Sequence, residues 1–115
     1  MSKHLSEPWF SLVYTRRKRV EGRLNKGFFG GLREGDLVEF YNDDLGFRRS
    51  VQVRVTKVVA YRCFLDLLHG ERRVLPTVRG VQNQLLVYRR FYSEEEEKRH
   101  GVVALRLSKE APGRS

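Results

Sequence analysis

Alternating valines in the middle of the chain constrain the fold more than any other feature. The stretch VQVRV at 51–55 alternates valine with polar or charged residues, and this period of two is typical of a strand with one buried face. Residues 36–41 have the same period, with Val38 and Phe40 on one face. The sequence NDDLG at 42–46 between them is typical of a turn, because Asn and Asp bond to their own backbone and Gly tolerates positive φ. We therefore predict a β-hairpin.

Two further strands are expected outside this hairpin. The alternation of the second hairpin strand loses phase at 57–59, which indicates a bulge or bend. A short strand is predicted at 19–24, and the apolar run GVVALRL at 101–107 is predicted to be the last strand. The glycine-rich segment NKGFFGG at 25–31 between strands is predicted to be a loop.

Helical signals appear at three places. Ser6 is the expected N-cap of a helix over 7–16, and CFLDLL at 63–68 predicts a short helix closed by His69 and Gly70. A third helix is expected where apolar residues recur at helical spacing, namely Val81, Leu85, Tyr88 and Tyr92. The acidic run EEEE at 94–97 is interpreted as a solvated segment or a local counterweight to the basic surface.

These elements predict a single α+β domain over 1–115, dominated by strands, with its helices grouped outside the sheet. Such a pattern favours a small barrel over an alternating α/β stack. Residues 1–5 and 109–115 are expected to be frayed tails.

The charge balance limits the class of partner. Lys and Arg number 23 against 14 Asp and Glu, which gives a net charge of +9. A potential of this sign attracts polyanions, of which nucleic acid is the commonest in a cell, although a basic surface can also serve solubility alone. The sequence has no apolar run long enough to span a membrane and no secretion signal, so we expect an intracellular protein. Whether it is cytoplasmic or nuclear stays open.

Several kinds of site are not supported by the sequence. Cys63 is the only cysteine, which excludes an internal disulfide and the usual zinc spacing, so neither a metal nor a cofactor is expected. The three histidines are scattered in a tail, at a helix end and beside the glutamate run, which argues against a catalytic triad. The glycines of FFGGLREGD at 28–36 lack the lysine and hydroxyl of a phosphate-binding P-loop.

Three phenylalanines follow no period and lie near basic residues in glycine-rich turns. They are candidates for stacking on bases: Phe28, Phe29 and Phe47. The competing interpretation is that each ring is tucked under its own loop.

The basic stretch RRKRVEGR at 16–23 contains one glutamate, and it resembles a family signature. Together with LREGDLVEF at 32–40, it is similar to the signature of the ASCH domain, the activating signal cointegrator homology domain. The matching residues are Lys18, Glu21, Arg23, Gly35 and Asp36. The resemblance extends from PWFSLV before the motif to GVVALRL at the end. Arg16 departs from it, because the family usually has glycine at that position.

The resemblance implies a fold and a range of functions. ASCH domains resemble PUA domains, so the expected fold is a small PUA-like β-barrel of about five to six strands with two to three flanking helices. The family is associated with RNA binding, some bacterial members are amidohydrolases of acetylcytidine, and a ribonuclease activity has been attributed to another member. The family's Lys, Glu and Arg, here Lys18, Glu21 and Arg23, line a cleft between the barrel and its helices.

Elementary strand geometry bears on that cleft. If Val20 points inward, alternation places Glu21 and Arg23 together on the other face, and Lys18 joins them only if the chain bends at Arg19. A glutamate beside an arginine can hold the guanidinium as a fixed fork for phosphate or a base edge. The alternative is a surface ion pair of little value.

We therefore expect an RNA-binding module with a basic cleft that accepts a nucleotide or single-stranded RNA, with DNA as a further possible partner. The residues expected to contact nucleic acid are Lys18, Arg23, Arg16, Arg17, Arg48 and Arg49 through phosphates, and Phe28 and Phe29 through stacking.

The alternative is a hydrolase of a modified nucleoside or of RNA, with Lys18, Glu21, Arg23 and Glu71 as the candidate catalytic residues. The acetylcytidine amidohydrolases carry a catalytic threonine where this chain has Glu21, so direct transfer of their mechanism is disfavoured. Whether the protein is an enzyme stays open at this point.

Overall fold

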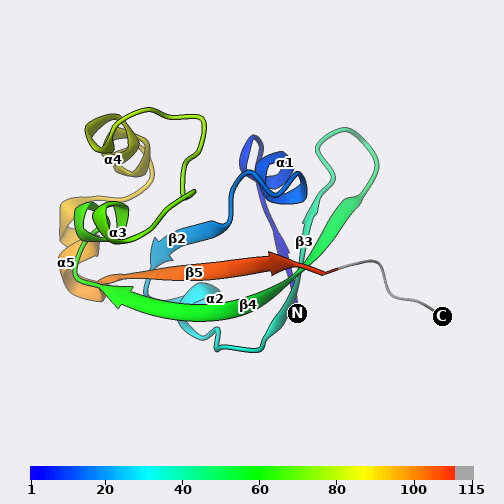
Figure 1. The fold of residues 1–115 in the computed structure, drawn as a ribbon, viewed down its shortest axis with the longest axis horizontal. Helices are drawn as coiled ribbons and strands as arrows, with labels where there is room; N and C mark the ends of the chain where they lie inside the picture. The colour runs from blue at the N-terminus through cyan, green and yellow to red at the C-terminus, as the bar shows by residue number, and fades with distance from the viewer. Residues whose placement is uncertain (111–115) are drawn as a thin grey trace.

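The computed structural model describes residues 1–110, which form one curved five-stranded sheet with helices around it (Figure 1). The strands lie in the order β1-β3-β4-β5-β2. Only the pair of β1 and β3 is parallel among these residues, and the other neighbours are antiparallel. The strands are β1 (Ser2–His4), β2 (Val20–Leu24), β3 (Leu37–Asn42), β4 (Arg49–Tyr61) and β5 (Val102–Lys109). The predicted α+β, strand-rich class is confirmed, with the sheet curled into half a barrel.

The predicted hairpin is confirmed as β3 and β4. Val38 pairs with Val53 and Phe40 pairs with Val51, and all four side chains are buried. The turn is closed by the Asn42 side chain, which accepts the Asp44 N–H. The bulge is also confirmed, because the pairing of β4 with β5 shifts register after Val55. The shift lets the 13-residue β4 pair with β3 along one half and β5 along the other.

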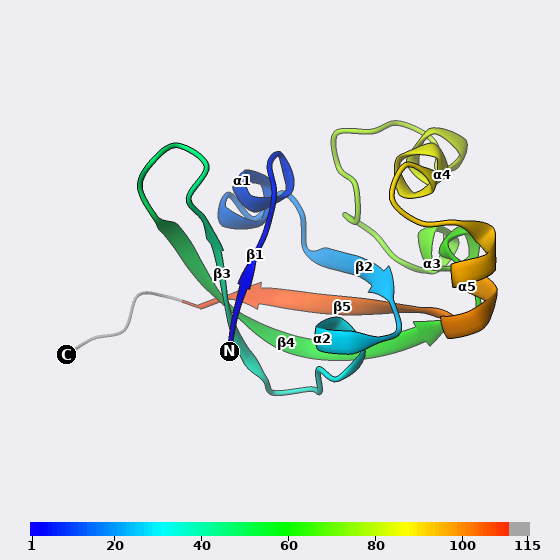
Figure 2. The ribbon, with the colours of Figure 1, turned by 180° about the vertical axis from the view of Figure 1, so that it is seen from behind.

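Five helices occur within residues 1–110: α1 (Trp9–Tyr14), α2 (Gly27–Gly30), α3 (Phe64–Gly70), α4 (Val81–Arg89) and α5 (Glu94–His100). The segments α3, α4 and α5 gather at one end of the sheet, and α1 lies beside β1 and β3 (Figures 1 and 2). Two of the five were not expected. The segment NKGFFGG contains a single helical turn, α2, and the glutamate run begins α5, where Ser93 and Glu96 form a reciprocal capping box.

Two predictions near the N-terminus were wrong. Residues 1–5 are not a frayed tail, because β1 pairs with β3 and the Leu5 N–H bonds to the Tyr41 carbonyl. Ser6 does not cap α1; Pro8 is the N-cap residue, and the Glu7 carboxylate accepts the N–H and hydroxyl of Ser11 in the first turn. At the other end, Glu110 still bonds through its N–H to Gln52. The rest of the predicted C-terminal tail, 111–115, lies outside the described residues.

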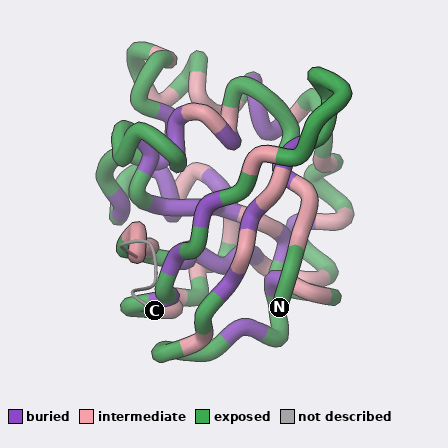
Figure 3. The backbone as a smooth tube through the Cα atoms, turned by 90° about the vertical axis from the view of Figure 1, so that its right-hand side faces the viewer, coloured by how far each residue is buried: buried purple, intermediate pink, exposed green. Residues whose placement is uncertain are grey.

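Buried residues recur along the strands (Figure 3), and the buried hydrophobic side chains form two clusters. One is built around Phe10, Phe40 and Val55, and the other around Phe64 and Leu67 of α3, which pack with Tyr88 of α4. Strand β5 contributes Val103 and Leu105 to the first cluster and Val102 and Ala104 to the second. Because successive strand residues point to opposite faces, the two clusters pack against opposite faces of β5. No helix formed by residues 1–110 has the length and apolar character needed to cross a membrane.

Candidate functional site

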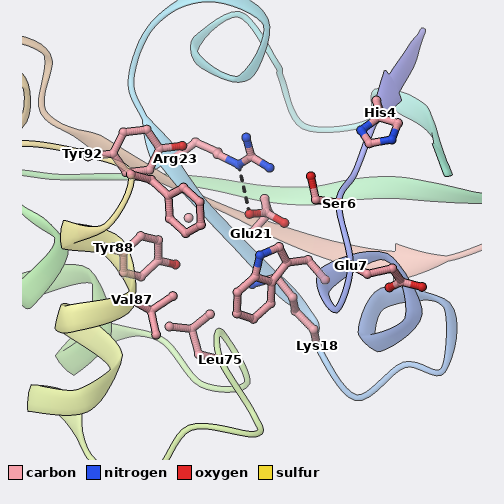
Figure 4. A pocket seen from close by; sticks show the side chains of 13 residues that line it. His4, Ser6, Glu7, Lys18, Glu21, Arg23, Leu75, Val87, Tyr88 and Tyr92 are labelled. Atoms are coloured by element: carbon pink, nitrogen blue, oxygen red, sulfur yellow. Dashed lines mark hydrogen bonds and ion pairs between the residues drawn. The ribbon is translucent and has the colours of Figure 1, made fainter. Parts of the chain in front are cut away.

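A cavity of about 320 Å³ lies between the N-terminal segment, β2 and the end of α4 (Figure 4). This size is at the lower end of the range of small-molecule sites. The wall is formed by side chains from residues 4–9, 18–23 and 87–92, with Leu75 from the α3–α4 loop. Lys18, Glu21 and Arg23 all line it, so the three residues singled out by the family resemblance meet in one place. Lys18 joins the others because it precedes β2, which begins only at Val20.

Lys18 is a buried lysine in this wall. Its side chain is only 2% exposed, and its Nζ donates to the Val74 carbonyl and lies 5.6 Å from the centre of the Trp9 ring. Burial lowers the pKa of Lys18, while the neighbouring Glu21 partly opposes that shift. A lysine in such a position can supply either a cation or, when deprotonated, an amine.

Glu21 and Arg23 form an ion pair at the cavity. The Arg23 Nε donates to Oε1 of Glu21 at 3.1 Å, and the guanidinium lies 4.2 Å from the centre of the Phe29 ring. The Glu21 side chain is 7% exposed and that of Arg23 is 25% exposed, so this is not a solvated surface pair. Oε2 of Glu21 is buried and has no hydrogen-bond partner among residues 1–110.

A second unpartnered polar atom belongs to Tyr88, a residue that sequence reasoning assigned only to the core. Its ring stacks on Phe64 at 4.2 Å, while its hydroxyl reaches the cavity without a partner among residues 1–110. Burial, with a contribution from the charge of Glu21, raises the pKa of Tyr88 well above its usual value. The hydroxyl therefore stays protonated and can donate a hydrogen bond. The sequence contains no signal that distinguishes Tyr88 from the other apolar residues of the predicted helix, Val81, Leu85 and Tyr92.

Aromatic rings form the remaining walls. Trp9 and Tyr92 are partly buried, whereas Phe91 is 61% exposed at the edge of the cavity. Of these three rings, only Tyr92 belongs to the apolar helical stripe that the sequence pattern singled out. Helix α4 ends at Arg89, beside the cavity, and Phe91 and Tyr92 follow it directly and line the cavity.

The other predicted arginines divide into two groups. Arg48 pairs with Glu39 at 2.6 Å, and Arg49 pairs with Glu7 at 3.1 Å, so both are already engaged within the protein. Arg16 and Arg17 are exposed. Arg16 has a φ of 64°, in the left-handed region, which agrees with its position where the family usually has glycine.

The stacking candidates lie away from the cavity. Phe29 is buried in the core and covered by Arg23, so its ring is not exposed for stacking on a base. Phe28 is half-buried against the same cluster. Phe47 is exposed in the β3–β4 turn.

Glu71 does not join the cavity. Its carboxylate accepts two hydrogen bonds from Arg106, at 2.8 and 3.0 Å, and one from the Tyr61 hydroxyl. Arg106 lowers the pKa of Glu71 against the effect of burial. Glu71 therefore lies apart from Lys18 and Glu21, and its carboxylate links the end of α3 to β5.

The glutamate run also contains a residue that sequence reasoning missed. Glu97 is buried, accepts the Phe64 N–H at 2.8 Å and pairs with Arg89 at 2.9 Å. Its carboxylate thus connects α5 with α3 and α4, and the run is not uniformly solvated.

Comparison with known proteins identifies the family. No curated protein matches the chain. Among solved structures, the crystal structure of hypothetical protein PH0355 is 31% identical, with a TM-score of 0.82 over 94% of this chain and 96% of that chain. The solution NMR structure of protein PF0455 from Pyrococcus furiosus is 34% identical, with a TM-score of 0.73 over 95% of this chain and 97% of that chain. The family model of the ASCH domain matches residues 4–111, nearly the whole length, and the chain therefore belongs to the ASCH domain family.

Proposed function

We propose that this ASCH domain binds RNA and that its cavity receives one unstacked base or nucleotide. The observation that carries the proposal is the pair of unpartnered atoms in the wall, Oε2 of Glu21 and the hydroxyl of Tyr88. A buried polar group without a partner costs about 1–3 kcal/mol, and more when it is charged. A ligand that supplies a hydrogen-bond donor to Glu21 and an acceptor to Tyr88 removes that cost. The edge of a nucleobase carries both kinds of group.

The rings and charges of the cavity support the same ligand. Trp9, Phe91 and Tyr92 offer flat apolar surfaces, on which an unstacked base gains stacking energy of about 1–3 kcal/mol. Lys18 and Arg23 provide positive charge in the wall, and the overall charge of +9 favours a polyanion. Single-stranded RNA combines all of these features, because its bases are free to leave the stack.

Direct binding tests the proposal. The purified protein is titrated with a single-stranded RNA 12-mer, a DNA of the same sequence and the individual nucleosides, over a range of salt concentrations. We expect the RNA to bind, its affinity to fall steeply with salt, and Arg23→Ala to weaken it. If wild-type protein binds neither nucleic acid at low salt, the proposal is wrong and a protein partner becomes the better explanation.

The burial of Lys18 favours hydrolysis of a modified nucleoside as a second candidate function. A lowered pKa makes more of the lysine amine available in its neutral form as a base or nucleophile, and Glu21 lies in the same wall. The position of Glu71 speaks against this candidate, because the acid is held by Arg106 outside the cavity. Turnover of acetylcytidine by wild-type protein, abolished in Lys18→Ala, would establish hydrolysis. Unchanged acetylcytidine after prolonged incubation would exclude that substrate.

A further inference from the structure

Five exposed arginines lie on two chain segments that meet beside Lys18. The first segment links α1 to β2 and the second follows α3. The Arg19 N–H donates to the Arg73 carbonyl at 3.0 Å. Beside this bond, the Lys18 ammonium donates to the Val74 carbonyl. We name these five residues the arginine face: Arg16, Arg17, Arg19, Arg72 and Arg73.

The charge of the arginine face is not neutralised within the described part of the chain. None of its members forms an ion pair with an acidic residue of 1–110, whereas Arg23, Arg48, Arg49 and four other arginines each do. Glu71 directly precedes Arg72 in sequence, but Arg106 and Tyr61 already occupy its carboxylate. The face therefore presents several guanidinium groups to solvent without a counter-charge.

The backbone of the arginine face is strained at two positions. Arg16 has a φ of 64° and Arg73 has a φ of 57°, and no other non-glycine residue of 1–110 has a positive φ. The left-handed region costs a residue with a side chain about 1–2 kcal/mol, a cost that glycine does not have. Strained residues of this kind concentrate at functional sites, where the side chain is needed despite its cost. Both outliers of the described chain are thus exposed arginines of one surface.

We propose that the arginine face binds successive phosphates of an RNA strand whose base occupies the cavity. This inference rests on the proposed function and adds the path of the strand. Lys18 lies in the cavity wall, and its sequence neighbours Arg17 and Arg19 are exposed on the arginine face. Lys18 and Leu75 both line the cavity (Figure 4), and the exposed arginines of both segments lie within three residues of them in sequence, so the strand would run from the cavity over these segments. Guanidinium groups suit this role because their planar fork matches phosphate oxygens.

The test removes two of the side chains without disturbing the backbone. In Arg16→Gly/Arg73→Gly, glycine accepts the left-handed conformation, so the double variant should be at least as resistant to urea as wild type. Each lost contact with a single-stranded phosphate lowers the slope of log K against log salt by about 0.7. We expect a slope smaller by about 1.4 and an RNA 12-mer bound about 25-fold more weakly at about 0.1 M salt. Nucleoside binding, which involves no phosphate, should not change.

The matched control is Arg33→Ala/Arg99→Ala, which removes the same charge from exposed positions outside the arginine face that form no ion pair within residues 1–110. For this control, the slope of log K against log salt should stay close to that of wild type. A second variant, Arg17→Gln/Arg72→Gln, probes the face at positions with ordinary φ and should reduce the slope similarly. If both face variants keep the slope of the control, the arginine face does not bind RNA and this inference is wrong. If wild-type protein did not bind nucleosides at all, the proposed function of the cavity would be contradicted instead.

Discussion

Arg23 and Glu21 lie two residues apart on β2, and the bond from Nε to Oε1 at 3.1 Å uses one carboxylate oxygen while the other is left without a partner among residues 1–110. The two oxygens of one side chain therefore have different roles. The first fixes the guanidinium as a fork, and the second is a buried acceptor facing the cavity.

Replacing this carboxylate by an amide is the most direct test of the acceptor. Glu21→Gln keeps the shape but removes the charge, and a hydrogen bond to a charged group contributes about 1.5–3 kcal/mol. We expect nucleoside affinity, measured by calorimetry, to fall about 10- to 100-fold. Glu39→Gln is the control, because Glu39 forms an exposed ion pair with Arg48. Equal affinities of the two variants would show that Glu21 does not contact the ligand.

Because Lys18 is buried, the free energy of unfolding is expected to change with pH in the alkaline range. Its folded-state pKa lies below the ordinary 10.5, so between these two values the unfolded chain holds a proton that the folded protein lacks. Raising the pH through that window therefore increases the free energy of unfolding. Urea denaturation of wild type and Lys18→Met should show this rise in wild type only.

The measurement is best kept below pH 10. Above that pH an unfolded tyrosine loses its proton while the buried Tyr88 retains it, and this difference would add a second pH dependence to the free energy of unfolding. Lys57→Met serves as the control, because Lys57 is exposed on β4. Parallel pH profiles for wild type and Lys18→Met would mean that Lys18 keeps an ordinary pKa.

Residue 22 must be glycine because the Tyr88 hydroxyl occupies the space that a side chain at this position would need. A Cβ at Gly22 would lie 2.6 Å from that oxygen and 3.3 Å from Leu67. Gly22→Ala should therefore lower the free energy of unfolding by about 1–3 kcal/mol. Removing the hydroxyl with Tyr88→Phe should recover a substantial part of the loss. A double-mutant cycle measures this coupling, and simple additivity of the two changes would contradict the predicted contact.

Glu97 should be the one critical residue of its acidic run. Glu97→Ala removes the acceptor of the Phe64 N–H and leaves Arg89 without its carboxylate. Breaking a buried pair in this way costs about 3–5 kcal/mol. Glu95→Ala, at an exposed position of the same helix, should change stability by less than about 0.5 kcal/mol. Similar urea midpoints for the two variants would show that the buried contacts of Glu97 carry little stability.

The hairpin could be predicted from sequence because its signals are local. Alternation at 51–55, the turn at 42–46 and the loss of phase at 57–59 each depend on neighbouring residues, and all three match β3, β4 and the bulge. Strand β1 could not be found in this way. Its three residues are too few to display a period, and its parallel partner lies 37 residues further along the chain.

The site was predictable only in part. The family signature selected Lys18, Glu21 and Arg23, and these three do line one cavity. Glu71 was misplaced because its partner Arg106 is 35 residues away, and Glu97 was missed because four adjacent glutamates carry no sign of which one faces inward. Both errors concern carboxylates whose environment is set by tertiary packing.

Trp9 is the only tryptophan of the chain, and it stands in the wall of the cavity beside Lys18. Its indole emission therefore comes from a single, known location, and a base that enters the cavity changes the polarity around that ring. Occupancy can be followed by intrinsic fluorescence in unlabelled protein, at concentrations too low for calorimetry. The protein thus carries its own optical reporter at the position where the ligand is expected.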